Sequence, residues 1–131
     1  MTRILELGAG QGRDTIFFAK HGCEVHVSNS SIHGIETIRE KAGALGLSSS
    51  LSAMCRDVRE PSAFDNAYFD ACYSDMLYCI ALTTANLEFL SREIRRVLRL
   101  GGLSIFTVRN MEDPHHKIGI HRGEDMYESI W

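Results

Sequence analysis

The chain has 131 residues, of which 44% are hydrophobic and 24% are charged, and its formal net charge is -3 with neutral histidines. This length and composition predict one globular domain, because the chain is too short for two independent cores. A mildly acidic chain lacks the basic surface that attracts nucleic acid or an anionic membrane, so we expect a small-molecule substrate or a protein partner.

The amino-terminal residues and the cysteines predict a cytoplasmic protein. The first residues run directly into an apolar segment that contains Glu6, which is too short and too charged for a signal peptide. No apolar run approaches the roughly 20 residues that a membrane-spanning helix needs. The cysteines form no C-x-x-C pair, which is typical of reduced, mostly buried thiols. They are Cys23, Cys55, Cys72 and Cys79.

Short apolar runs alternate along the chain with segments whose apolar residues recur at helical spacing. The predicted strands cover residues 4–7, 25–27, 51–55, 68–73 and 103–108. The predicted helices cover residues 14–21, 32–45 and 83–98, and glycines follow all three. Alternating strands and helices predict an α/β fold, with a parallel sheet that is covered by helices on both faces.

A glycine cluster, Gly8-Ala9-Gly10-Gln11-Gly12, follows the first predicted strand. Glycines at the end of a strand let the backbone come close to a ligand, although a tight turn without a ligand can use the same residues. A dinucleotide-binding loop has glycines at relative positions 0, 2 and 5, and this chain has Arg13 at the last of these. The spacing therefore disfavours a nicotinamide oxidoreductase.

Glu6 precedes the first glycine by two residues, and the resulting E-x-G-x-G-x-G pattern resembles motif I of class I, Rossmann-like S-adenosylmethionine-dependent methyltransferases. Further segments resemble the same family in the expected order. They are residues 25–31, 55–59, 69–78 and 96–103. The resemblance implies a three-layer Rossmann-like fold, S-adenosylmethionine as cofactor and methyl transfer to an unidentified small molecule. Residues 12–14 and 108–110 are similar to the tellurite-resistance-type methyltransferases.

The resemblance also implies a set of cofactor-binding residues. They are Glu6, Gly8, Ala9, Gly10, Asn29, Ser30, Asp57, Val58 and Ser74. In the family an acid after the second strand binds both ribose hydroxyls, and Asn29 holds this position here. An amide lacks the charge-assisted bond, so we expect cofactor binding to be weaker by about 1 kcal/mol. Asp57 is expected to accept a hydrogen bond from the adenine amino group, and the Val58 amide to meet a ring nitrogen. A helix cap at Asn29 and a turn at Asp57 are the alternatives without a cofactor.

The sequence does not identify the catalytic residues. The methyl donor is already activated, so positioning and exclusion of water can carry an in-line attack on the sulfonium methyl. Asp75 and Tyr78 are the nearest candidates for a base, with a helix cap and a packed aromatic ring as alternative roles. We expect no metal site, because the late histidines and acids match no metal-binding spacing. They are Glu112, Asp113, His115, His116 and His121.

The family's full sheet has seven strands in the order 3-2-1-4-5-7-6, and this chain offers five. We therefore expect residues 1–131 to form a single methyltransferase core domain, truncated at one or both ends and lacking the last two strands. The fifth strand would then be an open edge, which predicts a homodimer through that edge. A non-catalytic or degenerate cofactor-binding or interaction module is the alternative function. The arginines of the third helix are expected to form a solvated surface. They are Arg92, Arg95, Arg96 and Arg99.

Overall fold

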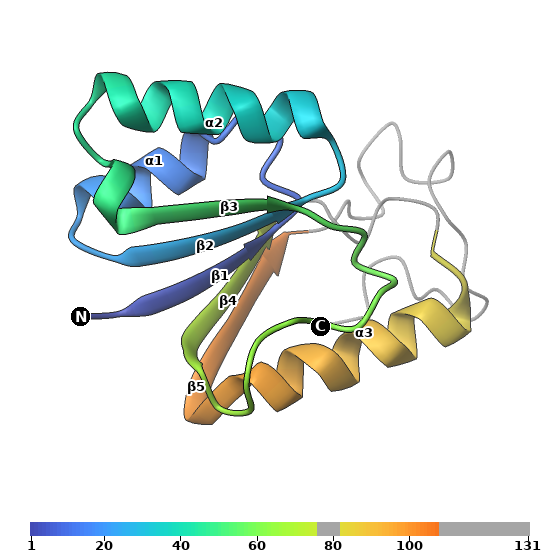
Figure 1. The fold of residues 1–131 in the computed structure, drawn as a ribbon. Coiled ribbons are helices and arrows are strands. Elements are labelled where there is room, and N and C mark those ends of the chain that lie inside the picture. Colours follow the sequence, from blue (N-terminus) through green and yellow to red (C-terminus); the bar gives the residue numbers. More distant parts are fainter. Residues whose placement is uncertain (76–81, 108–131) are drawn as a thin grey trace, which may run out of the picture.

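The computed structural model describes residues 1–75 and 82–107, and within them a five-stranded sheet lies between two layers of helices (Figure 1). The strands are β1 (Arg3–Leu7), β2 (Glu24–Asn29), β3 (Leu51–Cys55), β4 (Phe69–Asp75) and β5 (Leu98–Thr107). Their order across the sheet is β3-β2-β1-β4-β5, and every neighbouring pair is parallel. The predicted α/β fold and the strand order 3-2-1-4-5 are confirmed. The two further strands that we described as missing would follow residue 107, outside the described residues.

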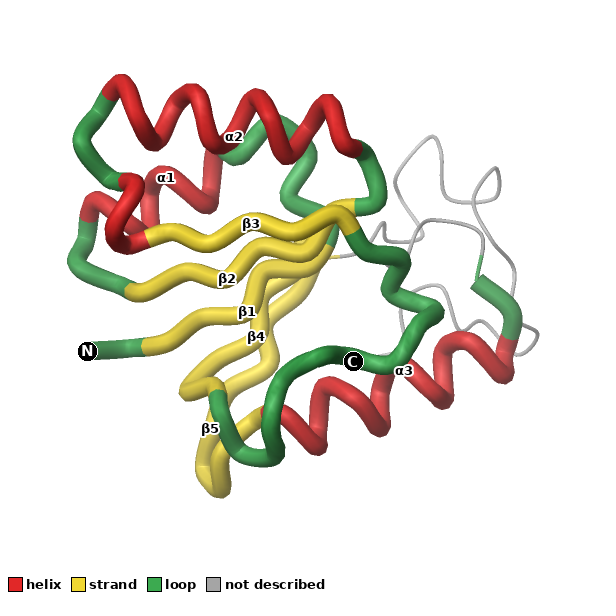
Figure 2. The backbone as a smooth tube through the Cα atoms, in the orientation of Figure 1, coloured by secondary structure: helices red, strands yellow, loops and turns green. Residues whose placement is uncertain are grey.

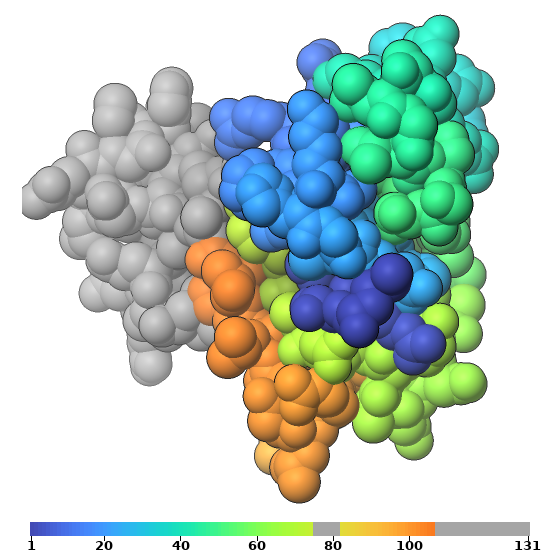
Figure 3. Space-filling view, turned by 90° about the vertical axis from the view of Figure 1, so that its left-hand side faces the viewer, coloured from blue at the N-terminus to red at the C-terminus, as the bar shows by residue number. Residues whose placement is uncertain are grey.

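Two helices cover one face of the sheet and the third covers the other (Figure 1). They are α1 (Arg13–Lys20), α2 (Ile32–Ala44) and, on the opposite face, α3 (Thr84–Val97), with a short 3-10 helix η1 (Ser48–Ser50) before β3. In the space-filling view the first residues of the chain (dark blue) lie between the α1–α2 layer above and the β5 region (orange) below (Figure 3). With helices on both faces of the sheet, the loops that connect strands and helices meet at the ends of the strands.

The helices α2 and α3 begin at residues whose side chains satisfy free backbone N–H groups. The Ser31 hydroxyl accepts a hydrogen bond from the Gly34 N–H at 3.1 Å, so Ser31 is the cap of α2 and the alternative of a cap at Asn29 is wrong. Thr83 and Asn86 form a reciprocal capping box at the start of α3. Both helices thus start at the end of the sheet that carries the candidate site.

The core consists of two clusters, one on each face of the sheet. Leu5 and Leu7 of β1 pack against α3, in a cluster whose other buried members include Phe69, Cys72, Leu87, Leu90, Ile94 and Val97. On the other face, Val25 and Val27 of β2 pack with Ala19, Ile35, Ile38 and Ala53. β1 is central in the sheet, and its residues from Ile4 to Leu7 are all buried. A parallel sheet covered on both faces requires such a strand.

The boundary between α3 and β5 differs from the sequence-based prediction. We expected Gly101-Gly102 to separate the helix from a strand at 103–108, but β5 begins at Leu98, directly after α3. Leu98 pairs with Phe69 and Leu103 with Ala71, so the extra residues of β5 form a bulge. A Cβ on Gly102 would lie 2.9 Å from the Arg99 carbonyl oxygen and 3.0 Å from that of Asp70. The glycine pair therefore allows close approach of two strands rather than ending a helix.

Candidate functional site

The carboxyl ends of the central strands bring most of the predicted cofactor residues to one edge of the sheet. Leu7 of β1 is in register with Ser28 of β2 and Ser74 of β4, and Asn29 is in register with Cys55 of β3. Two of the loops that leave this edge are the glycine loop and the β3–β4 loop (Figure 2). The glycine loop (residues 8–12) leads to α1, and the β3–β4 loop (residues 56–68) runs along α3 to the start of β4. Open α/β sheets bind ligands at this edge.

The glycine loop has a backbone that only glycine adopts readily. Gly8, Gly10 and Gly12 have φ values of 68°, 58° and 87°. The Gly8 N–H donates to the Ser28 carbonyl at 2.8 Å, and the Gly12 N–H donates to the Ala9 carbonyl at 3.0 Å. A Cβ on Gly12 would lie 2.6 Å from Ile38 Cγ1, whereas one on Gly10 would meet nothing within 4 Å. The loop is therefore packed at Gly12 and open at Gly10, where a ligand could approach the backbone.

A buried carboxylate lies between β1 and the start of α1. Glu6 is 2% exposed, and its Oε1 accepts a hydrogen bond from the hydroxyl of Thr15, which is fully buried. An ionised group at such a position needs hydrogen bonds or a cation. Glu6 thus places a buried carboxyl group two residues before the glycine loop, at the position that the motif predicts.

The amide of Asn29 is buried against the glycine loop. Asn29 is 8% exposed, and its Nδ2 donates to the Gly10 carbonyl at 3.1 Å while its Oδ1 accepts from the Ser31 N–H at 3.3 Å. The neighbouring Ser30 is exposed, and its carbonyl accepts a hydrogen bond from the Cys55 thiol at 3.4 Å. Asn29 and the glycine loop, which are 19 residues apart in sequence, are thus directly joined.

Asp57 and Val58 open the β3–β4 loop. The Asp57 Oδ1 accepts hydrogen bonds from the Arg59 backbone N–H at 2.8 Å and from the Arg59 Nε at 3.0 Å. These bonds to Arg59 hold the pKa of Asp57 below its usual range, so the group is a carboxylate at neutral pH. Val58 packs against the core cluster under α3. Asp57, Val58, Ser28 and Leu90 line a small cavity of about 40 Å³ between loop, sheet and α3.

Of the remaining predicted residues, some lie within the described structure and others lie outside it. Ser74 is 2% exposed beside Leu7, and the backbone of Asp75 ends β4 in register with Thr107. Tyr78, Glu112, Asp113 and the histidines at 115, 116 and 121 lie outside the described residues. Within residues 1–75 and 82–107, no three His, Cys, Asp or Glu side chains could hold a metal ion together. In the same ranges, no helix has the length and apolar character to cross a membrane.

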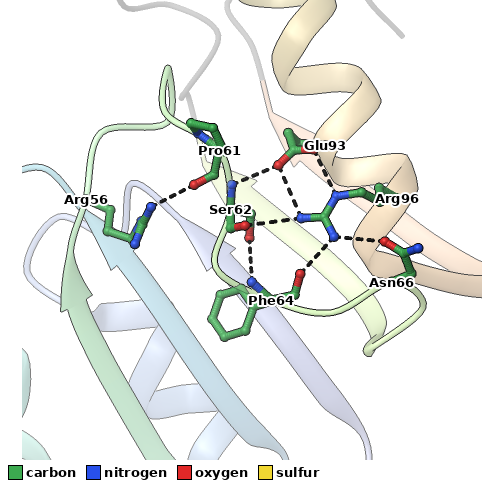
Figure 4. Close-up of polar contacts among 7 residues, drawn as sticks. All are labelled: Arg56, Pro61, Ser62, Phe64, Asn66, Glu93 and Arg96. Atoms are coloured by element: carbon green, nitrogen blue, oxygen red, sulfur yellow. Dashed lines mark hydrogen bonds and ion pairs between the residues drawn. The ribbon is translucent and has the colours of Figure 1, made fainter.

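Sequence reasoning missed the role of Arg96, which we predicted to be a solvated surface group. Its guanidinium points from α3 into the β3–β4 loop (Figure 4) and donates to the Ser62 carbonyl at 3.2 Å, the Phe64 carbonyl at 2.8 Å and the Asn66 Oδ1 at 2.9 Å. Arg99, expected to be solvated too, forms an ion pair with Asp70 at 2.5 Å. The solvated-surface interpretation is therefore wrong for Arg96, whereas the Arg99 side chain is 53% exposed and lies on β5 rather than on α3.

Glu93 completes the Arg96 network, which we define as Ser62, Phe64, Asn66, Glu93 and Arg96 (Figure 4). Its Oε2 pairs with the Arg96 Nε at 2.9 Å, and its Oε1 accepts from the Ser62 N–H at 2.8 Å. The hydrogen bond from Arg96 lowers the pKa of Glu93, and the Ser62 N–H adds to this. The spacing of Glu93 and Arg96 on one helix was the available signal, but it does not reveal the loop carbonyls that they hold.

A second contact between distant elements was also missed. The Tyr73 hydroxyl of β4 donates to the Asp14 Oδ2 at 2.9 Å, and the Tyr73 ring packs edge-on against Phe18. Asp14 and Phe18 both belong to α1. The helix that follows the glycine loop is therefore fixed to β4 as well as to β1.

Comparison with known proteins places this arrangement among methyltransferase domains. The family model described as a methyltransferase domain matches residues 4–102. No curated protein matches the chain. A solved structure of the PH0226 protein from Pyrococcus horikoshii OT3 is 25% identical, with a TM-score of 0.71 over 80% of this chain and 49% of that one.

Two other similar structures show the same fold at lower identity. The [4+2]-cyclase SpnF is 24% identical, with a TM-score of 0.70 over 79% of this chain and 38% of its own. A geranyl diphosphate C-methyltransferase from Streptomyces coelicolor A3(2), solved with Mg2+, geranyl diphosphate and S-adenosyl-L-homocysteine, is 17% identical. Its TM-score is 0.71 over 81% of this chain and 39% of its own. The chain thus spans less than half the length of each of these three structures.

Proposed function

Because the chain belongs to the methyltransferase domain family, whose model covers residues 4–102 of its 131 residues, we propose that it binds S-adenosylmethionine and transfers the methyl group to an acceptor. The observation that carries this proposal is the edge of the sheet where Glu6, the glycine loop, Asn29 and Asp57 meet. The similar structures named above share the fold, and the fold alone does not fix a reaction.

The residues at this edge fit the chemistry of S-adenosylmethionine. Gly10 has open space where its side chain would be, so the loop backbone is accessible to the amino-acid part of the cofactor. Glu6 places a carboxyl group next to the glycine loop in sequence, and the ionised Asp57 supplies an acceptor for the adenine amino group. When bound, the cofactor supplies a methyl group that is already activated on a sulfonium, so the task of these residues is to orient it and exclude water.

We further propose that the acceptor is a small molecule and that Asp75 and Tyr78 are the first residues to test as a base. The net charge of -3 supports a small acceptor over nucleic acid. Asp75 ends β4 immediately after the buried Ser74, which is the position that the resemblance assigns to the reacting methyl group. A non-catalytic cofactor-binding module is the second candidate, favoured by the amide of Asn29 where the family has an acid.

Calorimetry with S-adenosylmethionine, S-adenosylhomocysteine and NADH tests the cofactor assignment. We expect both adenosyl ligands to bind and NADH not to bind. Asp57→Ala removes an acceptor for the adenine amino group, and we expect it to weaken binding about tenfold. Glu40→Ala is the matched control, because Glu40 is an exposed acid on α2 away from this edge. A folded chain that binds neither adenosyl ligand would contradict the proposal, and turnover with an acceptor panel would separate an enzyme from a binding module.

We also propose that β5 mediates a homodimer. β5 is at the edge of the sheet within the described residues, and Leu103 and Ile105 are 62% and 50% exposed there. An open edge with exposed apolar side chains favours pairing with another chain. Sedimentation at micromolar concentration should give a dimer, and Leu103→Lys should shift it toward monomer. A purely monomeric wild type would contradict this proposal without affecting the cofactor assignment.

A further inference from the structure

Asn29 differs from the acid of the family in hydrogen bonding as well as in charge, since an amide can donate a hydrogen bond and a carboxylate cannot. In this chain the amide N–H of Asn29 forms such a hydrogen bond. Nδ2 donates to the Gly10 carbonyl at 3.1 Å, and Oδ1 accepts from the Ser31 N–H at 3.3 Å. We call these two bonds the amide bridge. Only one orientation of the amide satisfies both partners, because one is an acceptor and the other a donor.

The start of α2 is shaped around the amide bridge. A Cβ on Gly34 would lie 2.7 Å from the Asn29 Nδ2 and 2.9 Å from the Gly10 carbonyl oxygen. Both distances are shorter than any that a real Cβ accepts, and Gly34 is buried in the first turn of the helix. Gly34 therefore provides the space in which Asn29 and Gly10 meet.

The amide bridge fixes the direction of a peptide plane in the glycine loop. The Gly10 carbonyl belongs to the peptide that carries the Gln11 N–H, and in a trans peptide these two groups point in opposite directions. Holding the carbonyl toward Asn29 therefore turns the Gln11 N–H away from Asn29. The next carbonyl, that of Gln11, accepts a hydrogen bond from the Lys41 Nζ at 2.8 Å. Two polar side chains, from β2 and α2, thus set the orientation of this loop.

We infer that Asn29 is a positioning residue for cofactor binding: its amide N–H holds the glycine loop through the Gly10 carbonyl, and a neutral donor is required at this position. The inference rests on the proposed function for its ligand. It reverses the expectation from the sequence, in which the missing carboxylate only weakens binding. With an acid at position 29, a carboxylate oxygen would face the Gly10 carbonyl oxygen, and attraction would become repulsion.

The variant Asn29→Asp tests the inference because protonation restores the donor. At about pH 7.5 we expect Asn29→Asp to bind S-adenosylhomocysteine about tenfold more weakly than wild type. The facing carbonyl raises the pKa of the new carboxyl, so the deficit should shrink as the pH falls to about 5 and an O–H again donates to Gly10. If residue 29 serves mainly as a ribose acceptor, Asn29→Asp binds more tightly than wild type at about pH 7.5. That result would overturn the inference.

Other titratable groups near the amide bridge are common to both proteins, so the ratio of the two affinities at each pH removes their contribution. On α2 and at the ends of β2 and β3 they are His33, Glu36, Lys41, Cys55, Arg56 and Asp57. A second variant leaves Asn29 intact. Gly34→Ala places a methyl group in the amide bridge, and we expect it to weaken binding at all pH values. Gly43→Ala, in the same helix, is the matched control, because its Cβ would lie 3.9 Å from the nearest atom, the Ser48 Oγ.

Thermal unfolding separates failure of the inference from failure of the proposed function. If the wild type binds no adenosyl ligand, the proposed function fails, but the amide bridge can still be measured in the free protein. Asn29→Asp should then have a lower Tm than wild type at about pH 7.5 and a smaller deficit at about pH 5. A deficit that does not change with pH, or no deficit, would refute the role of the amide as a donor.

Discussion

The glycine loop and the β3–β4 loop, both at the carboxyl edge of the sheet, are held in different ways. The glycine loop is held mainly by neutral groups: its own backbone N–H and carbonyl groups, the amide of Asn29, and the packing of Gly12 against Ile38, to which the exposed Lys41 ammonium adds one hydrogen bond on the Gln11 carbonyl. The β3–β4 loop is held by an ion pair, because Arg96 and Glu93 of α3 donate to and accept from its backbone (Figure 4). The first loop belongs to the α1–α2 face of the sheet and the second to the α3 face.

This difference predicts different sensitivities for the two loops. Steric contacts and neutral hydrogen bonds respond to a single added methyl group and little to salt. A partly exposed ion pair responds to pH and ionic strength, because its charges titrate and are screened. The side chains of Glu93 and Arg96 are 17% and 32% exposed, so this pair lies between a buried and a surface pair.

The largest effect should come from Gly12→Ala. The new Cβ would lie 2.6 Å from Ile38 Cγ1, and φ is 87°. Left-handed strain and overpacking together should lower the free energy of unfolding by about 3 kcal/mol in urea denaturation. Gly10→Ala is the matched control, with φ at 58° and nothing within 4 Å of the new Cβ. It should lose only the strain, about 1 kcal/mol. Equal losses in both variants would show that packing against Ile38 does not hold the loop.

The second effect should come from Arg96→Ala. This change leaves the carbonyls of Ser62 and Phe64 without their donor, and we expect a loss of about 2 kcal/mol in the free energy of unfolding. Arg95→Ala is the control, because Arg95 is exposed on the same helix and the described structure gives it no hydrogen bond or ion pair. Hydrogen exchange should show faster opening of the β3–β4 loop only in Arg96→Ala. If both arginine variants behave alike, the Arg96 network contributes nothing to the loop.

The arrangement of elements could be predicted from sequence because each signal is local. Helical spacing and glycines located α1, α2 and α3, and β3 has the predicted bounds of Leu51–Cys55. The boundary at β5 could not be predicted in the same way. A pair of glycines ends a helix in one context and permits a bulge in another, and the contact that decides between them is with Asp70 on a neighbouring strand.

In the candidate site, too, the sequence motif predicts which residues are present, whereas the contacts between them appear only in the structure. The motif located Glu6, the glycine loop and Asp57, whose positions in sequence follow from strand ends. It could not show that Asn29 donates to Gly10, because that bond joins residues from two different strand ends. Nor could it show that Arg96 holds a loop 30 residues away, since a helix arginine has the same pattern whether it is solvated or bound to carbonyls.

The smallest effect on stability should come from removing the charge of Glu93, and it should depend on pH. The hydrogen bond from Arg96 depresses the pKa of Glu93 in the folded chain, so its contribution to stability is present above the unfolded pKa, near 4.5, and is lost as the pH falls through the folded pKa. Glu93→Gln should therefore be less stable than wild type by about 0.5–1 kcal/mol at neutral pH, and the difference should vanish in acid. Added salt should reduce it at neutral pH. Glu88→Gln, at an exposed position on the same helix, is the matched control and should leave stability at neutral pH unchanged. A difference for Glu93→Gln that persists in acid would mean that shape rather than charge holds the β3–β4 loop, and the two loops would then be held alike.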